Sequence, residues 1–210
     1  GDSRTFFYNP GAGDLLDDFS KATVGTEVFL RSNPFGGASA QGRQGFNILR
    51  VVVNRTEAEP FRLPASLGTA PTLSAGAATQ TRTFNIGVAM SGMNMGAMKG
   101  MHTINGKVYS MNRVDEQVKL GATEIWEFDN SAGDEPHPMH LHGTFFQVLS
   151  RTGGRNALTA TEKGLKDTVL VMPGERVRIL TQFNTPGLFV FHCHNLEHED
   201  DGMMLNYSVS

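Results

Sequence analysis

Residues 188–209 read LFVFHCHNLEHEDDGMMLNYSV, in which an apolar, strand-like lead runs into Cys193, the one cysteine of the chain. Side chains on a strand alternate between its two faces with a period of two residues. We therefore expect Cys193 to point to one face, and its neighbours His192 and His194 to point to the other. One segment of this kind can contact two separate metal sites.

A second group of histidines lies upstream, in the stretch HPMHLHG. It supplies His137, His140 and His142, so six of the seven histidines of the chain fall into two short clusters. The pair His140 and His142 repeats the same-face spacing of the downstream pair. We expect a turn at Pro138 to aim His137 elsewhere, toward Cys193.

A thiolate, two imidazoles and a weak thioether are the ligands of a blue-copper electron-transfer centre. The chain offers this set as His137, Cys193, His198 and Met203. A structural zinc site fits less well, because zinc favours about four Cys or His ligands and this chain has one cysteine. Non-metal roles for the histidines and a nucleophilic Cys193 are also weaker interpretations, the latter because the adjacent histidines face away from the thiol.

These two motifs resemble those of the multicopper oxidases, the family of laccases, cuprous oxidases and bilirubin oxidases. A third segment, DLLDDFSKATVGTEVFLRS, is similar to the end of the family's second domain, so the resemblance covers the whole chain. The resemblance implies a type 1 copper held by His137, Cys193, His198 and axial Met203. It further implies a type 2 copper at His140 and type 3 coppers at His142, His192 and His194.

The activity implied by this resemblance is oxidation coupled to O2 reduction. A reducing substrate, a phenol or Cu(I), gives single electrons to the type 1 copper, and Cys193 passes them to a trinuclear cluster that reduces O2 to water. The complete enzyme holds four coppers, and this chain supplies half of the trinuclear histidines. We therefore expect a C-terminal part, inactive alone, whose missing N-terminal cupredoxin domain is in the same protein or another chain.

Two other functions use the same residues. A copper-binding electron carrier without oxidase activity needs only the type 1 ligands, and the paired H-x-H and H-C-H motifs argue against it. A copper-storage or copper-resistance protein would use the methionine-rich loop formed by Met90, Met93, Met95, Met98 and Met101. Soft sulfur ligands favour Cu(I), so this loop either docks cuprous ions or forms an adaptable cover over an apolar substrate cleft.

Three further residues carry expectations. Glu199 follows His198, and in related oxidases an acidic residue there is associated with moving protons to the oxygen-reducing cluster; a solvated carboxylate is the alternative. Trp126 falls in an alternating strand pattern and is expected in the core, with a platform for the substrate as the alternative. Asp167 is expected at a strand end or beside a ligand, and we assign it no chemistry.

Strand-like segments bounded by Gly, Pro, Asn and Asp recur from Thr81 onward and predict an all-β sandwich. They are TRTFNIGVAM, KVYSM, TEIWEFDN, FFQVLSR, DTVLVM, RVRILTQF, LFVFHCH and MMLNYSV. The resemblance makes residues 81–210 a Greek-key, cupredoxin-like domain. Residues 55–80, rich in Pro, Ala, Ser, Thr and Gly, are expected to be a linker. Residues 1–54 carry the runs EVFLRS and FNILRVVVN and are expected to end a preceding cupredoxin domain.

Composition excludes some partners. A formal net charge of -3 gives no basic field for nucleic acid. No apolar run approaches the length of a membrane-spanning helix, and no secretory signal opens the sequence. The family resemblance nevertheless implies an exported protein, periplasmic or secreted, that uses O2 and a one-electron reducing substrate.

Overall fold

The computed structural model describes residues 19–34, 43–58, 65, 72–88 and 102–210. The chain forms two units, Asp14–Thr69 and Gly1–Gly13 together with Ala70–Ser210. Both histidine motifs belong to the second unit. The break between Thr69 and Ala70 falls inside the stretch predicted as a linker, and the domain boundaries proposed from the sequence stay a prediction.

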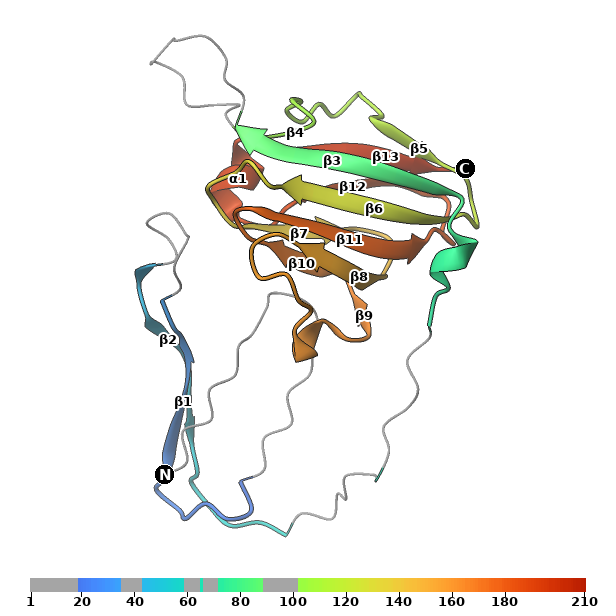
Figure 1. Cartoon of the computed structure of the whole chain (residues 1–210). Helices are drawn as coiled ribbons and strands as arrows, with labels where there is room; N and C mark the ends of the chain where they lie inside the picture. The colour runs from blue at the N-terminus through green and yellow to red at the C-terminus, as the bar shows by residue number, and fades with distance from the viewer. Residues whose placement is uncertain (1–18, 35–42, 59–64, 66–71, 89–101) are drawn as a thin grey trace, which may run out of the picture. The chain divides into compact units, whose positions relative to one another are not determined.

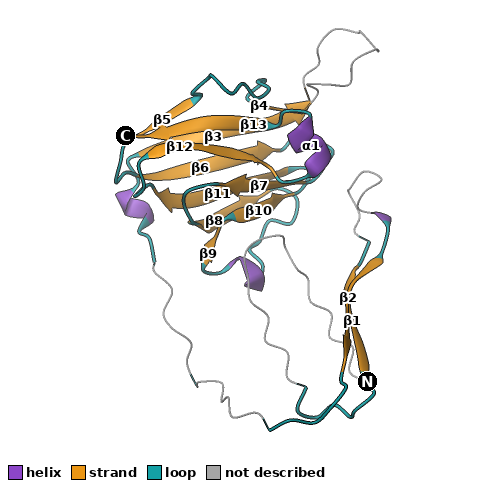
Figure 2. Cartoon of the chain, turned by 180° about the vertical axis from the view of Figure 1, so that it is seen from behind, coloured by secondary structure: helices purple, strands orange, loops and turns teal. Residues whose placement is uncertain are grey.

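Two β-sheets face each other in the second unit (Figures 1 and 2). The five-stranded sheet has the order β10-β7-β12-β13-β5, and its strands in chain order are β5 (Glu116–Val118), β7 (His137–Leu141), β10 (Thr168–Val171), β12 (Gly187–Cys193) and β13 (Met204–Val209). The six-stranded sheet has the order β4-β3-β6-β11-β8-β9, from β3 (Gln80–Val88), β4 (His102–Ile104), β6 (Thr123–Asn130), β8 (Phe146–Thr152), β9 (Leu165–Lys166) and β11 (Glu175–Gln182). The predicted all-β sandwich is confirmed.

Aromatic side chains fill the space between the sheets. Burial alternates along β6, and Trp126 and Phe128 have no exposed surface. The Trp126 ring centroid lies 4.8 Å from that of Phe84 and 5.0 Å from that of Phe191, within the range of favourable aromatic pairs. The prediction that Trp126 belongs to the core is confirmed. Phe191 comes from the opposite sheet, two residues before Cys193, so the core fixes the strand that carries the thiol.

One predicted strand is wrong. In the segment KVYSM, Lys107 makes only an isolated bridge to Ile104, and the next residues are irregular. Asn105 and Gly106 form the turn between the two bridge partners with φ angles of 54° and 70°. Tyr109 then donates its backbone N–H to the Gly202 carbonyl at 2.9 Å. A five-residue apolar alternation is too short to separate a strand from such a loop.

The Asp14–Thr69 unit contains a two-stranded antiparallel sheet, β1 (Glu27–Ser32) and β2 (Phe46–Val52), where two apolar runs were predicted. Large apolar side chains remain exposed on it. Phe46, Ile48 and Leu49 are each more than half exposed. An isolated hairpin is marginally stable in water, so its described strands need a further apolar surface to pack against.

Helices are short. Those assigned among the described residues are the 3-10 turns η2 (Ala75–Ala77) and η3 (Ala160–Glu162) and the α-helix α1 (Leu196–Asp200). Within the described ranges, none has the length and apolar character needed to cross a membrane.

Candidate metal centre

Strands β7 and β12 bring the two histidine motifs together. They are antiparallel neighbours, with His192 opposite His140 and Cys193 opposite Met139. Directly opposed residues share a face of the sheet, and successive residues alternate between faces. His140 and His192 therefore share one face, while Cys193 and His137 share the other.

The turn predicted at Pro138 is wrong. His137–Leu141 is one continuous strand with alternating burial. His137 and His140 are three residues apart, so alternation alone sends their side chains to opposite faces. The Pro138 carbonyl accepts a hydrogen bond from the His194 N–H at 2.7 Å, which ties the end of β12 to β7.

Helix α1 returns the chain to Cys193. Its N-cap is Asn195, whose side chain accepts the Glu197 N–H at 3.1 Å and so satisfies one of the free donors of the first turn. This single turn brings His198 back over the end of β12. An extended chain would carry His198 away from the thiol, because each strand residue advances about 3.3 Å.

Three donor atoms meet in a buried triangle. The Cys193 Sγ lies 3.7 Å from His137 Nδ1 and 3.5 Å from His198 Nδ1, and the two nitrogens are 3.1 Å apart. A point equidistant from all three atoms lies about 2.0 Å from each, close to the bond lengths of a first-row metal ion to imidazole and thiolate. This arrangement fits one ion of about that size.

Burial sets the protonation of this triangle. It lowers the pKa of His137 to about 3, with smaller contributions from His198 and His102, and it also lowers the pKa of His198. Both rings are therefore neutral at pH 7, the form that binds metals. Burial raises the pKa of the metal-free Cys193 thiol to about 12, and a bound cation would favour the thiolate instead.

Met203 follows His198 by five residues and belongs to the hydrophobic core. Its side chain is fully buried in the same apolar cluster as Cys193. Its carbonyl accepts the Cys193 N–H at 3.1 Å, and its N–H donates to the His198 carbonyl at 2.9 Å. The backbone thus links the proposed axial ligand to two of the triangle residues.

Four more rings gather on the opposite face of β7 and β12. The ring centroids of His140, His142, His192 and His194 lie 4.8 to 5.4 Å apart in five pairs. His142 Nε2 is 3.1 Å from His192 Nε2. Their donor atoms and that of His140 lie within 4.8 Å of one another. His142 and His194 are exposed, so this cluster, unlike the triangle, is open to its surroundings.

Backbone carbonyls orient two of these rings. His140 Nδ1 donates to the Asp167 carbonyl at 2.9 Å and also lies 2.9 Å from Thr168 Oγ1. His192 Nδ1 donates to the Cys193 carbonyl at 3.0 Å. A carbonyl can only accept, so in both rings Nδ1 carries the proton and Nε2 keeps a free lone pair for a metal. Burial lowers the pKa of both histidines, which also favours the neutral form.

Glu199 lies beside the same cluster. Its Oε2 atom is 3.3 Å from His192 Nδ1, and its side chain is partly exposed. Asp167 follows strand β9, and it serves His140 through its carbonyl rather than through its side chain.

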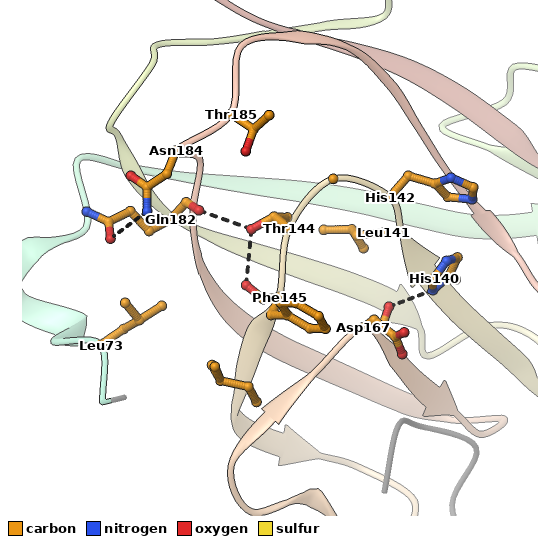
Figure 3. Close-up of a pocket in the computed structure, with 12 residues that line it drawn as sticks. Leu73, His140, Leu141, His142, Thr144, Phe145, Asp167, Gln182, Asn184 and Thr185 are labelled. Carbon is orange, nitrogen blue, oxygen red and sulfur yellow. Dashed lines mark hydrogen bonds between the residues drawn. The ribbon is translucent and has the colours of Figure 1, made fainter. Parts of the chain in front are cut away.

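A hollow of about 630 Å³ opens next to His140 and His142 (Figure 3). His140, His142 and Asp167 line one end, Gln182 and Asn184 line the other, and Phe145 lies between them. Phe145 is 58% exposed.

The histidine motif HPMHLHG ends in a glycine for a steric reason. Gly143 has φ +76°, a conformation that L side chains rarely adopt, and a Cβ atom there would lie 2.5 Å from the Phe189 ring. The turn at Gly143 holds His142 in place, and the His142 carbonyl accepts a hydrogen bond from the Tyr207 hydroxyl.

Sequence reasoning missed three polar neighbours of the triangle. Glu135 Oε2 lies 3.1 Å from His198 Nε2 and 3.3 Å from His102 Nε2. Because a carboxylate accepts, His198 donates through Nε2 and leaves Nδ1 free for a metal. His102 also contacts Asp201. Glu135 precedes His137 by two residues, and that proximity was the available signal.

The methionines predicted to dock Cu(I), from Met90 to Met101, lie outside the described residues.

This chain is similar to known multicopper oxidases in sequence and in structure. The multicopper oxidase family model matches residues 79–210. A laccase from Haloferax volcanii is 48% identical over 110 residues, which are 51% of this chain and 19% of the laccase. The crystal structure of the multicopper oxidase McoA from Aquifex aeolicus matches with a TM-score of 0.75 and 31% identity, over 92% of this chain and 42% of McoA.

A third match is the multicopper oxidase from Campylobacter jejuni, described as a metallo-oxidase, with a TM-score of 0.69 and 28% identity over 88% of this chain and 41% of that protein. The chain thus spans less than half the length of the relatives that it matches. These structural matches confirm the predicted cupredoxin-like fold. Because the family model covers more than half of the sequence, this chain belongs to the multicopper oxidase family.

Proposed function

We propose that this chain is the C-terminal part of a multicopper oxidase that couples one-electron oxidation of a substrate to the reduction of O2 to water. The observation that carries the proposal is the position of Cys193 between two donor clusters. Its thiol belongs to the buried triangle, while its neighbours His192 and His194 belong to the open cluster. The polypeptide is the shortest covalent connection between the two.

The two donor clusters would hold copper of three types. His137, Cys193 and His198 would hold type 1 copper, with Met203 as the axial ligand. His140 would hold type 2 copper, and His142, His192 and His194 would hold type 3 copper. Bound copper would supply one-electron redox chemistry. The protein's own part is to exclude water from the triangle, where all three residues are at most 4% exposed. It also holds the rings of His198, His140 and His192 through the nitrogen that does not face the metal site.

The exposed rings support a second protein surface at the open cluster. A trinuclear site needs more ligands than four histidines. His142 and His194 are exposed, and His142 lines the hollow that contains Phe145. We propose that an N-terminal cupredoxin domain, in the same protein or in another chain, covers this face and supplies the remaining ligands. The exposed apolar hairpin β1-β2 would pack in a preceding cupredoxin domain.

Glu199 is proposed as the proton carrier of the open cluster. Its Oε2 atom lies 3.3 Å from His192 Nδ1, and its partial exposure gives it contact with solvent. A carboxylate with one side toward water and the other toward the cluster can take up and release the protons that O2 reduction consumes. The exported location and the choice between a phenol and Cu(I) as reductant rest on the family resemblance.

Copper stoichiometry and oxygen uptake test the proposal. We expect a longer chain that includes the N-terminal domain to bind four coppers, with a type 3 absorption band, and to consume O2 in the presence of a phenol or Cu(I). The 210-residue chain alone should consume almost none. If the longer chain binds a single blue copper and consumes no O2, the protein is an electron carrier and the proposal fails.

A further inference from the structure

His102 is the one histidine outside the two motifs, and it begins strand β4 (His102–Ile104). Strand β4 pairs with β3, at the edge of the six-stranded sheet, where His102 is opposite Val88. The triangle residues His137, Cys193 and His198 come instead from the other sheet and from α1. His102 therefore reaches the triangle from a different part of the sandwich.

Both nitrogens of the His102 ring face a carboxylate. Nδ1 lies 2.9 Å from Asp201 Oδ2, and the His102 backbone N–H donates to the same oxygen at 2.7 Å. Nε2 lies 3.3 Å from Glu135 Oε2. These two carboxylates come from different ligand segments. Asp201 stands between His198 and Met203, whereas Glu135 stands two residues before His137.

The ring of His102 also covers the ring of His198. Their centroids are 3.9 Å apart and their planes differ by 18°, which is a stacked pair. The edge of His198 is held as well, because its Nε2 lies 3.1 Å from the same Glu135 oxygen that His102 contacts. His198 is thus fixed on its face by His102 and at its outer nitrogen by Glu135, with Nδ1 directed to Cys193.

We propose that His102 is a positioning residue for the copper held by Cys193: it clamps the Glu135 and Asp201 segments together and keeps the His198 ring in its ligating orientation. This inference rests on the proposed function. The clamp joins the two segments that carry the triangle's imidazoles, and outer partners of this kind orient metal ligands and tune the metal. Without the His102 side chain, the His198 ring loses the stacking contact that fixes its orientation.

Copper titration of the 210-residue chain tests the clamp. His102→Phe keeps an aromatic ring to stack on His198 but removes both nitrogens. Asp201→Asn weakens the same clamp from the other side. We expect each variant to lower the copper affinity of the Cys193 site by roughly tenfold to a hundredfold, and to shift the blue absorption band and the reduction potential. Thr103→Val is the matched control, because Thr103 also lies in β4 but bonds to the Gly87 carbonyl.

The double variant His102→Phe with Asp201→Asn separates a clamp from two independent effects. The effects of two substitutions that break the same contact do not add. The double variant should therefore bind copper about as tightly as the single variant that has the lower copper affinity. Circular dichroism of each metal-free variant checks folding; should the Phe variant unfold, Asp201→Asn alone must still show the loss.

Two results distinguish the failures. If the wild-type chain forms a blue site and the His102 and Asp201 variants bind copper within twofold of it with an unshifted band, the positioning role is overturned while the proposed function stands. If the wild-type chain itself forms no blue site that depends on Cys193, the type 1 assignment is overturned together with the clamp.

Discussion

The substitution Gly143→Ala tests how tightly the HPMHLHG turn is built. The residue has φ +76°, and an alanine in this left-handed conformation costs about 1–2 kcal/mol. The added Cβ would also lie 2.5 Å from the Phe189 ring, so that ring or the turn must move. Overpacking of this kind costs about 1–3 kcal/mol. We therefore expect a total loss of about 2–5 kcal/mol in the free energy of unfolding.

Gly106→Ala is the matched control. Gly106 has nearly the same φ, +70°, but a Cβ there would meet no atom within 4 Å. It should lose only the conformational part, and urea unfolding of both variants gives the steric part as the difference. Phe189→Ala removes core packing of its own, so it serves as the background of a double-mutant cycle: Gly143→Ala should cost less in that background, by about the steric part. Equal losses for the two glycine variants would refute the steric account of the turn.

Three further predictions concern charge, proton supply and the axial ligand. Burial alone would raise the pKa of Glu175, but hydrogen bonds and charges from Arg155, the Met172 N–H and Arg151 hold it at about 2. The ionised carboxylate thus adds about 3 kcal/mol to the free energy of unfolding above pH 4.5, and this contribution is lost as the pH falls toward 2. Urea unfolding measured from pH 7 to 2 should show the loss, and Glu175→Gln should remove this pH dependence. Glu199→Gln should lower O2 turnover of the assembled oxidase roughly a hundredfold or more with copper content intact, and unchanged turnover would exclude Glu199 from proton supply. Met203→Leu should raise the reduction potential of the type 1 site in a redox titration, and an unchanged potential would argue against Met203 as a ligand.

Strand periodicity accounts for much of what could be predicted. Alternation along LFVFHCH is enough to send Cys193 and His192 to different faces, and the structure has them in different clusters. The strand runs around Trp126 and in the β1-β2 hairpin also follow local pattern. These features depend on residues close in sequence, so the sequence alone carries them.

Long-range packing accounts for what was missed. Strand β7 was not predicted because its five residues, HPMHL, include a proline and two histidines and lack a strand-like composition. Its partners β10 and β12 are distant in sequence. The contacts of His102 with Glu135 and Asp201 span 33 and 99 residues, and no local pattern encodes such separations.

Copper titration of the 210-residue chain, followed by visible absorption and electron paramagnetic resonance, tests the central claim most directly. The buried triangle predicts one blue copper per chain, with an intense thiolate band that disappears in Cys193→Ser while the variant stays folded. A chain that binds copper without this band, or a band that survives the loss of the Cys193 thiol, would contradict the assignment of Cys193 as the junction between the two copper sites.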